Sequence, residues 1–106
     1  MPKFLIRASY TAAGAAGVLK EGGSGRAKAI EALAKSVGGS VESMYWALGA
    51  DDFFCICDMP DTAAVAALSL TVGASGAANI ATAQLLTAAE VDDVVGRRVE
   101  YRAPGA

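Results

Sequence analysis

The sequence predicts one α+β domain over residues 1–96, followed by a C-terminal tail or arm over residues 97–106. Two observations predict this class. Short apolar runs typical of strands alternate along the chain with segments whose apolar residues recur every three or four positions, as in helices. Glycine pairs and prolines separate these segments. A chain of 106 residues has the size of a single domain.

The first segment, residues 3–10, alternates as a strand, with Phe4, Ile6, Ala8 and Tyr10 on one face. Thr11 is an N-cap residue for a short helix over 12–20. With Lys20 and Arg26, the glycine-rich residues 22–25 resemble an anion cradle at a helix N-terminus, but the glycine pattern of phosphate-binding loops is absent. These glycines are therefore expected to break the chain as a flexible connector. A second helix is expected over 26–37, with an apolar stripe of Ala27, Ile30, Leu33, Ala34 and Val37.

Two strands follow, over 40–48 and 52–58, joined by a tight turn at 49–51. In the first strand, Val41, Ser43, Tyr45 and Ala47 are expected on one face. The second has an apolar run without clean alternation, which predicts burial on both faces. Pro60 ends it, and Asp61 can cap the next helix.

The last segments predict a helix over 62–72, a strand over 78–86 and a short helix over 88–95. Thr87 and Glu90 have the spacing of a capping box at the start of the last helix. The order β-α-β-β-α-β is the ferredoxin-like arrangement, a four-stranded antiparallel sheet with its helices on one face. The short helix is an addition at the C-terminal end.

The composition argues against several functions. The net charge of −2 gives no basic face for nucleic acid. The chain has no histidine, the commonest metal and haem ligand, so no metal or cofactor is expected. Cys55 and Cys57 point to one face of a strand, where they are expected to stay unbonded in a reducing, cytoplasmic compartment. No signal peptide or membrane span is apparent.

The face of the sheet without helices is expected to carry large apolar residues. It must contain several of Phe4, Ile6, Tyr10, Met44, Tyr45, Trp46, Phe53, Phe54 and Ile56, although the pattern does not decide which. An exposed apolar patch of this kind marks an interface or a ligand site. We therefore expect a homodimer, or a higher oligomer, in which two sheets pack face to face into a shared α/β barrel.

Short features recur in order along nearly the whole chain, namely Tyr10-Thr11, Gly14, Lys20, Arg26, Gly38-Gly39, Gly49, Asp52, Pro60-Asp61 and Thr82. In these features the chain resembles the GYD domain proteins of the dimeric α/β-barrel superfamily. The family's Gly-x-Tyr-Asp motif falls on residues 49–52, where Asp51 replaces the tyrosine. This replacement argues against chemistry that needs a phenol there. The resemblance implies a fold and a dimer but no reaction, because the family has no established activity.

Asp52 is the candidate catalytic residue, because burial beside Phe53 would raise its pKa and make it a usable base. The competing interpretation is that Asp51 and Asp52 form the turn. Tyr10, Tyr45, Trp46 and Asp52 are the candidate ligand-binding residues, with core or interface packing as the alternative for the aromatic side chains.

Three functions remain open. The first is a homodimeric module that binds a small hydrophobic or aromatic molecule in an apolar pocket. The second is a cofactor-independent oxygenase or isomerase that uses Asp52 and a tyrosine. The third is a structural or regulatory assembly subunit. A cavity lined by Asp52 and a tyrosine hydroxyl favours the second, an apolar cavity favours the first, and a filled interior leaves the third.

Overall fold

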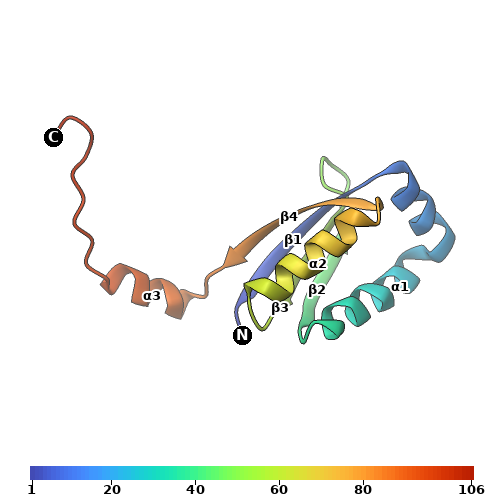
Figure 1. The fold of residues 1–106 in the computed structure, drawn as a ribbon, viewed down its shortest axis with the longest axis horizontal. Helices are drawn as coiled ribbons and strands as arrows, with labels where there is room; N and C mark the ends of the chain where they lie inside the picture. The colour runs from blue at the N-terminus through green and yellow to red at the C-terminus, as the bar shows by residue number, and fades with distance from the viewer.

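A computed structural model describes residues 1–106 and confirms the predicted α+β, ferredoxin-like fold (Figure 1). The elements in chain order are β1 (Lys3–Tyr10), α1 (Ala12–Ser36), β2 (Ser40–Trp46), β3 (Phe53–Asp58), α2 (Thr62–Ala74), β4 (Ala78–Leu85) and α3 (Ala88–Gly96). The four strands form one antiparallel sheet in the order β2-β3-β1-β4. Helices α1 and α2 lie on the same face of this sheet.

The two helices expected before β2 are one kinked helix, α1. The predicted break over residues 22–25 is confined to Gly22, whose φ of 74° and ψ of 173° interrupt the helical backbone. Glycine adopts this positive φ without a steric penalty, so the chain bends there and then resumes the helix. Figure 1 shows the first half of α1 beside the ends of β1 and β4 and the second half running back along the sheet.

The register assigns each strand residue to one of two faces, because residues directly opposite one another share a face. Ile6 pairs with Cys55 and Thr82 on the face toward the helices, and Leu5 pairs with Ile56 and Ala83 on the other face. The expectation that β3 is buried on both faces is wrong. Its residues alternate between fully and partly buried, because α1 and α2 cover only one side.

The expected grouping of β2 residues is wrong at Val41, which lies on the face opposite to Ser43 and Tyr45. A bulge between Val41 and Ser43 inserts an extra residue, so Val41 and Met44 oppose Cys57 and Cys55 on the helix side. Trp46 therefore joins the helix side, and Tyr45, opposite Phe54, joins the face without helices. The large apolar residues on that face are Leu5, Tyr45, Phe54, Ile56 and Leu85, and we call it the open face.

The start of α1 lies very close to the start of β4. The hydroxyl of Thr11 accepts a hydrogen bond from the Gly14 N–H at 3.2 Å and donates one to the Gly76 carbonyl at 2.6 Å. A Cβ on Gly14 would overlap the carbonyl oxygen of Ala77. The absence of a side chain at Gly14 therefore permits the contact that fixes the first half of α1.

Helix α3 stands away from the rest of the molecule at the end of β4 (Figure 1). Every residue from Leu86 to the C-terminus is exposed, including Val91, Val94 and Val95. The predicted capping box is present, with the Glu90 N–H bonded to the Thr87 hydroxyl and the Thr87 N–H bonded to the Glu90 carboxylate. Local capping thus defines a helix that buries none of its residues.

Replacing Gly14 with alanine is expected to destabilise the fold by about 1–3 kcal/mol, because the new methyl group must displace the Ala77 backbone. Gly17→Ala is the matched control in the same helix, where a Cβ meets no atom within 4 Å. That change should raise the free energy of unfolding by about 0.5–1 kcal/mol through helix propensity. Urea denaturation measures both, and equal effects would show that the Gly14 contact is unimportant.

Candidate functional site

The candidate site is an apolar cavity between the sheet and the two helices. Helix α1 lies mainly over β2 and α2 mainly over β4, so the central strands β3 and β1 form a floor between them. The cavity has a volume of about 90 Å³. Its lining is hydrophobic except for Arg26 and comprises Ile6, Ala8, Tyr10, Arg26, Ile30, Leu33, Ala34, Val41, Phe53, Cys55, Cys57, Leu68, Val72, Ala77, Ala78 and Ile80. Sites for small apolar molecules have this character.

A second hollow of about 170 Å³ adjoins the cavity below the first half of α1. It shares Tyr10, Arg26 and Ala77 with the cavity and adds Glu21 and Gly17 from α1. Arg26 and Glu21 lie on either side of the Gly22 kink, with 3.6 Å between a guanidinium nitrogen and a carboxylate oxygen. The polar groups of the site thus gather where the hollow meets the cavity, at Tyr10, Arg26 and Ala77, and we call this region the mouth. The interior of the cavity is apolar.

Tyr10 connects this mouth to the end of β2. Its hydroxyl oxygen accepts a hydrogen bond from the indole N–H of Trp46 at 3.0 Å. The Trp46 ring in turn meets the Phe53 ring edge-on, with 5.1 Å between the ring centroids. Of the four predicted ligand-binding residues, Tyr10 lines the cavity, and Trp46 supports Tyr10 from outside it.

Asp52 holds the β2–β3 hairpin against β1. Its carboxylate accepts the Tyr10 N–H at 2.8 Å, while its own N–H bonds to the Ala8 carbonyl at 2.8 Å. Both contacts continue the β1–β3 ladder beyond the last paired residues. Asp52 is absent from the cavity lining. A role for Asp52 as a base or ligand contact stays a prediction, and its geometry is that of a backbone anchor.

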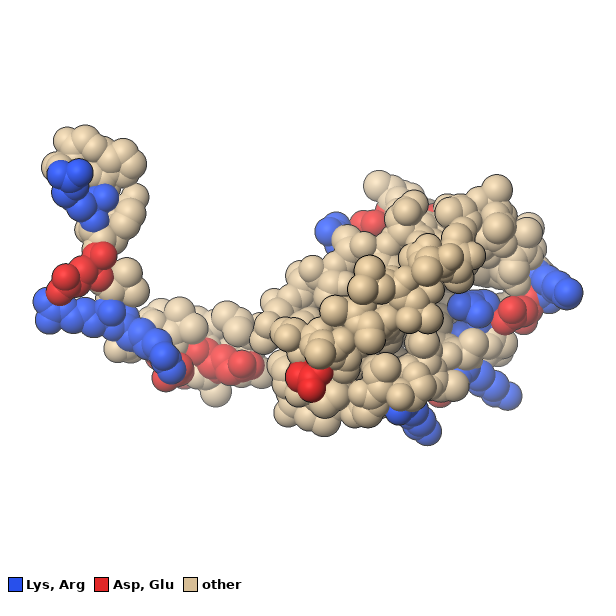
Figure 2. Space-filling model, viewed as in Figure 1, with Lys and Arg blue, Asp and Glu red and all other residues tan.

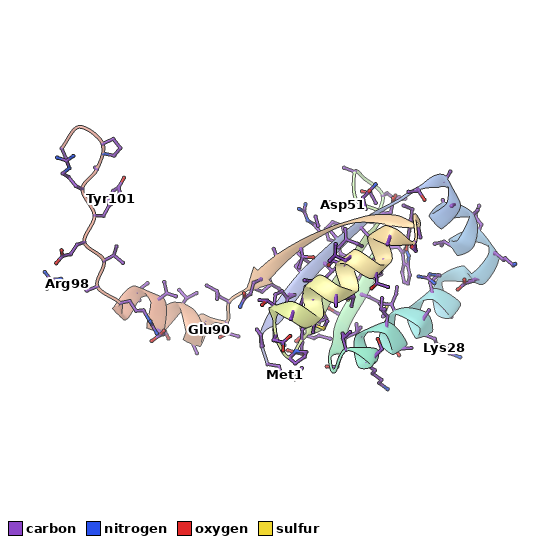
Figure 3. All side chains as sticks on the ribbon, viewed as in Figure 1. Met1, Lys28, Asp51, Glu90, Arg98 and Tyr101 are labelled. Carbon is purple, nitrogen blue, oxygen red and sulfur yellow. The ribbon has the colours of Figure 1, made fainter.

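The neighbouring Asp51 serves the opposite face. One carboxylate oxygen lies 3.4 Å from the Arg7 guanidinium, and the other accepts a hydrogen bond from the Ser9 hydroxyl at 3.5 Å. Figure 3 shows Asp51 in the hairpin loop beyond the ends of the strands. Tyr45 also lies on the open face and is 72 % exposed. The structure therefore brings Tyr10, Trp46 and Asp52 together but not Tyr45.

The cavity residues from α1 were missing from the predicted site. Arg26 precedes Ile30 by four positions and Leu33 by seven, so it falls on the apolar stripe that predicted the helix. A cation on an apolar stripe is the signal that marks it. The sequence pattern offers Arg26 only as part of the anion cradle over residues 20–26, for which a flexible connector is the preferred interpretation.

The two cysteines lie in the cavity floor as buried, free thiols. The hydrogen bond with Cys57, together with burial, raises the pKa of the Cys55 thiol. Cys57 also points its sulfur toward the Phe4 carbonyl oxygen at 3.8 Å. A buried thiol with a raised pKa is a poor nucleophile, so Cys55 acts as packing.

The open face combines an apolar centre with ion pairs of Lys3 toward one end and of Arg7 toward the other. The Lys3 ammonium lies 2.9 Å from Asp58 and 3.0 Å from Glu42, and these hydrogen bonds raise the pKa of Lys3.

In Figure 2 the surface over α2 carries no charge, and charged side chains gather along α1, α3 and the tail. No three metal-ligating side chains lie together, and no helix has both the length and the hydropathy needed to cross a bilayer.

Asp52→Ala is expected to lower the free energy of unfolding by about 1–3 kcal/mol, because the Tyr10 N–H loses its acceptor. Asp52→Asn keeps an acceptor oxygen and should retain most of the stability. Asp51→Ala, the adjacent control, should cost at most about 1 kcal/mol because its contacts are long and partly exposed. Thermal unfolding ranks the three variants, and a costly Asp52→Asn would reveal a need for the negative charge itself.

The chain matches the family model of the GYD domain over residues 4–95. No curated protein and no solved structure matches it. The matched region runs from the first buried residue of β1 through α3 and so includes the cavity, the open face and the Asp52 hairpin. The chain belongs to the GYD domain family.

Proposed function

We propose that the protein is a homodimeric module that binds a small hydrophobic or aromatic molecule in the cavity between sheet and helices. The observation that carries this proposal is the cavity itself, with a volume of about 90 Å³ and a hydrophobic lining broken only by Arg26. Protein interiors are otherwise close-packed, so an unfilled apolar space among the core side chains is unusual. A ligand that fills it gains contacts with those walls.

Binding without a reaction is better supported than catalysis. A proton-transfer mechanism needs a base within hydrogen-bond reach of the substrate. Asp52, the candidate base, is outside the cavity lining, and its carboxylate already accepts the Tyr10 N–H. Cys55 in the floor is a poor nucleophile, because burial and the hydrogen bond with Cys57 raise the pKa of its thiol. A purely structural subunit is less well supported because the interior is hollow.

The dimer is proposed from the open face. Tyr45, Phe54, Ile56 and Leu5 form a continuous apolar strip across three strands, and none of them packs against a helix of the same chain. A second copy covers this strip if the two open faces meet about a two-fold axis. The ion pairs of Lys3 and Arg7 then lie around an apolar centre, as in the polar rim of an ordinary interface.

We also infer a reducing, cytoplasmic location for the protein. Cys55 and Cys57 are free although they are adjacent on one face of β3. Their spacing on a single strand does not suit an unstrained disulfide, and cysteines that stay as free thiols are typical of reducing compartments.

Val72→Phe is expected to fill the cavity and to reduce the affinity for octan-1-ol, a neutral apolar probe, about ten-fold or more, which corresponds to about 1.4 kcal/mol. Val95→Phe is the matched control, because Val95 lies on α3, is 77 % exposed and is remote from the cavity. Chemical-shift titration of both variants and of the unchanged chain gives the affinities. Unchanged affinity in Val72→Phe, or no saturable binding to the unchanged chain, would contradict a ligand site in the cavity.

Tyr45→Lys is expected to convert a dimer into a monomer, because the new ammonium groups would be buried without partners between two sheets. The fold itself should be unaffected, since Tyr45 is 72 % exposed within one chain. Leu19→Lys, at an 88 % exposed position on α1, is the control and should remain dimeric. Sedimentation equilibrium decides, and a monomeric unchanged chain would overturn the shared barrel.

A further inference from the structure

Arg26 is the one charged residue in the lining of the cavity. About two thirds of its side chain is covered, since 32 % is exposed. A guanidinium has five N–H donors in a planar fork. In this structure none of them makes a side-chain hydrogen bond, and the nearest acidic oxygen, on Glu21, is 3.6 Å away. A largely covered cation at the edge of an apolar cavity is thus left with unused donors.

The Tyr10 hydroxyl supplies a second unused donor at the same mouth. Its oxygen already accepts the Trp46 indole N–H, and its own proton makes no hydrogen bond within the protein, so it remains available to an acceptor. Tyr10 and Arg26 together line both the cavity and the adjoining hollow. Both groups are hydrogen-bond donors, and Arg26 is also a cation. The mouth therefore complements a negatively charged hydrogen-bond acceptor.

Within the protein, Glu21 is only a weak acceptor for the Arg26 donors. Its side chain is 47 % exposed, and an ion pair at 3.6 Å near the surface contributes little. A carboxylate presented by a ligand could accept two parallel N–H bonds from Arg26, which is the strong, planar geometry for this pair. The ligand would exchange a long contact for short ones, while Glu21 turns to solvent on its own side of the Gly22 kink.

The interior determines the rest of the ligand. Beyond Arg26 and Tyr10, the walls are aliphatic side chains, Phe53 and the two buried thiols. A wholly polar anion would leave these walls unfilled and would lose its hydration. An apolar tail, by contrast, strengthens binding with each CH₂ group that it buries against these walls.

We propose that the cavity binds amphiphilic carboxylates, with the carboxylate on Arg26 and the Tyr10 hydroxyl and the apolar tail between α1, α2 and the sheet. This inference rests on the proposed function, because it names the class of molecule that the cavity would hold. It assigns Arg26 as the residue that determines specificity for anions.

The test compares octanoate with octan-1-ol, which share the same chain and differ in charge. Octanoate should bind the unchanged protein about ten-fold more tightly or better, as expected for a charge-assisted bidentate pair. Arg26→Gln should remove this preference and leave the affinity for octan-1-ol within about two-fold. Glu21→Gln should strengthen octanoate binding, because it removes the competing carboxylate.

Lys28→Gln is the matched control, since it changes the net charge by the same amount on the same helix. Lys28 is exposed and points away from the sheet (Figure 3). It should not alter the preference for octanoate. Chemical-shift titration gives the affinities, and thermal unfolding checks that each variant is folded.

The outcomes separate the two proposals. If neither probe binds, the proposed function fails, and the choice of carboxylates fails with it. If octan-1-ol and octanoate bind equally, or if Arg26→Gln leaves the preference intact, the cavity remains a ligand site but the role of Arg26 is overturned. A preference that Lys28→Gln abolishes as completely as Arg26→Gln would mean a general charge effect, and this too overturns the proposal.

Discussion

Two helices with mostly small side chains must cover a sheet of four strands, and the rest of the structure follows from this mismatch. The residues that α2 turns toward the sheet are Val65, Leu68 and Val72, and much of its remaining length is alanine. Helix α1 lies over the opposite edge of the sheet. Between the helices the floor includes Ala8 and Cys55, which are also small. The hollow interior is therefore a consequence of side-chain volume.

The same strands serve two surfaces of different character. Adjacent residues of β2 illustrate this, because Trp46 supports the Tyr10 hydroxyl on the helix side while Tyr45 lies on the open face. Adjacent residues of the hairpin do the same, with Asp52 bonded to the Tyr10 backbone and Asp51 to Arg7 and Ser9. A ligand in the cavity and a partner on the open face would thus lie on opposite sides of a single sheet. The central strands β1 and β3 would contact both of them.

Much of the architecture was predictable because its signals are local. The capping box at Thr87, the N-cap at Asp61 and the apolar periodicity of each segment all depend on residues a few positions apart. The bulge after Val41 has no local signal of this kind, so alternation alone grouped Val41 with Ser43 and Tyr45, from which the bulge separates it. The number of glycines similarly suggested a long break where the tertiary structure needs one bend at Gly22.

The candidate site was less predictable, because the cavity depends on how far apart the helices lie. The sequence predicts Tyr10 as a site residue from its position at the end of an apolar strand face. It does not predict Arg26 as a cavity residue, although helical periodicity places Arg26 on the same stripe as Ile30. The sequence predicts Asp52 as a candidate base, because it is a carboxylate beside Phe53. Only the register of β1 and β3 reveals that it occupies the position of a missing ladder acceptor.

The separation of α3 from the body has a consequence for where the polypeptide tolerates insertion and cleavage. The packed part of the molecule ends at Leu85, about ten residues before the end of the family match at residue 95. Since no residue after Leu85 is buried, extensions, fusions or cleavage there would leave the sheet and the cavity undisturbed. A protease would therefore reach the segment after Leu85 before it reaches the sheet.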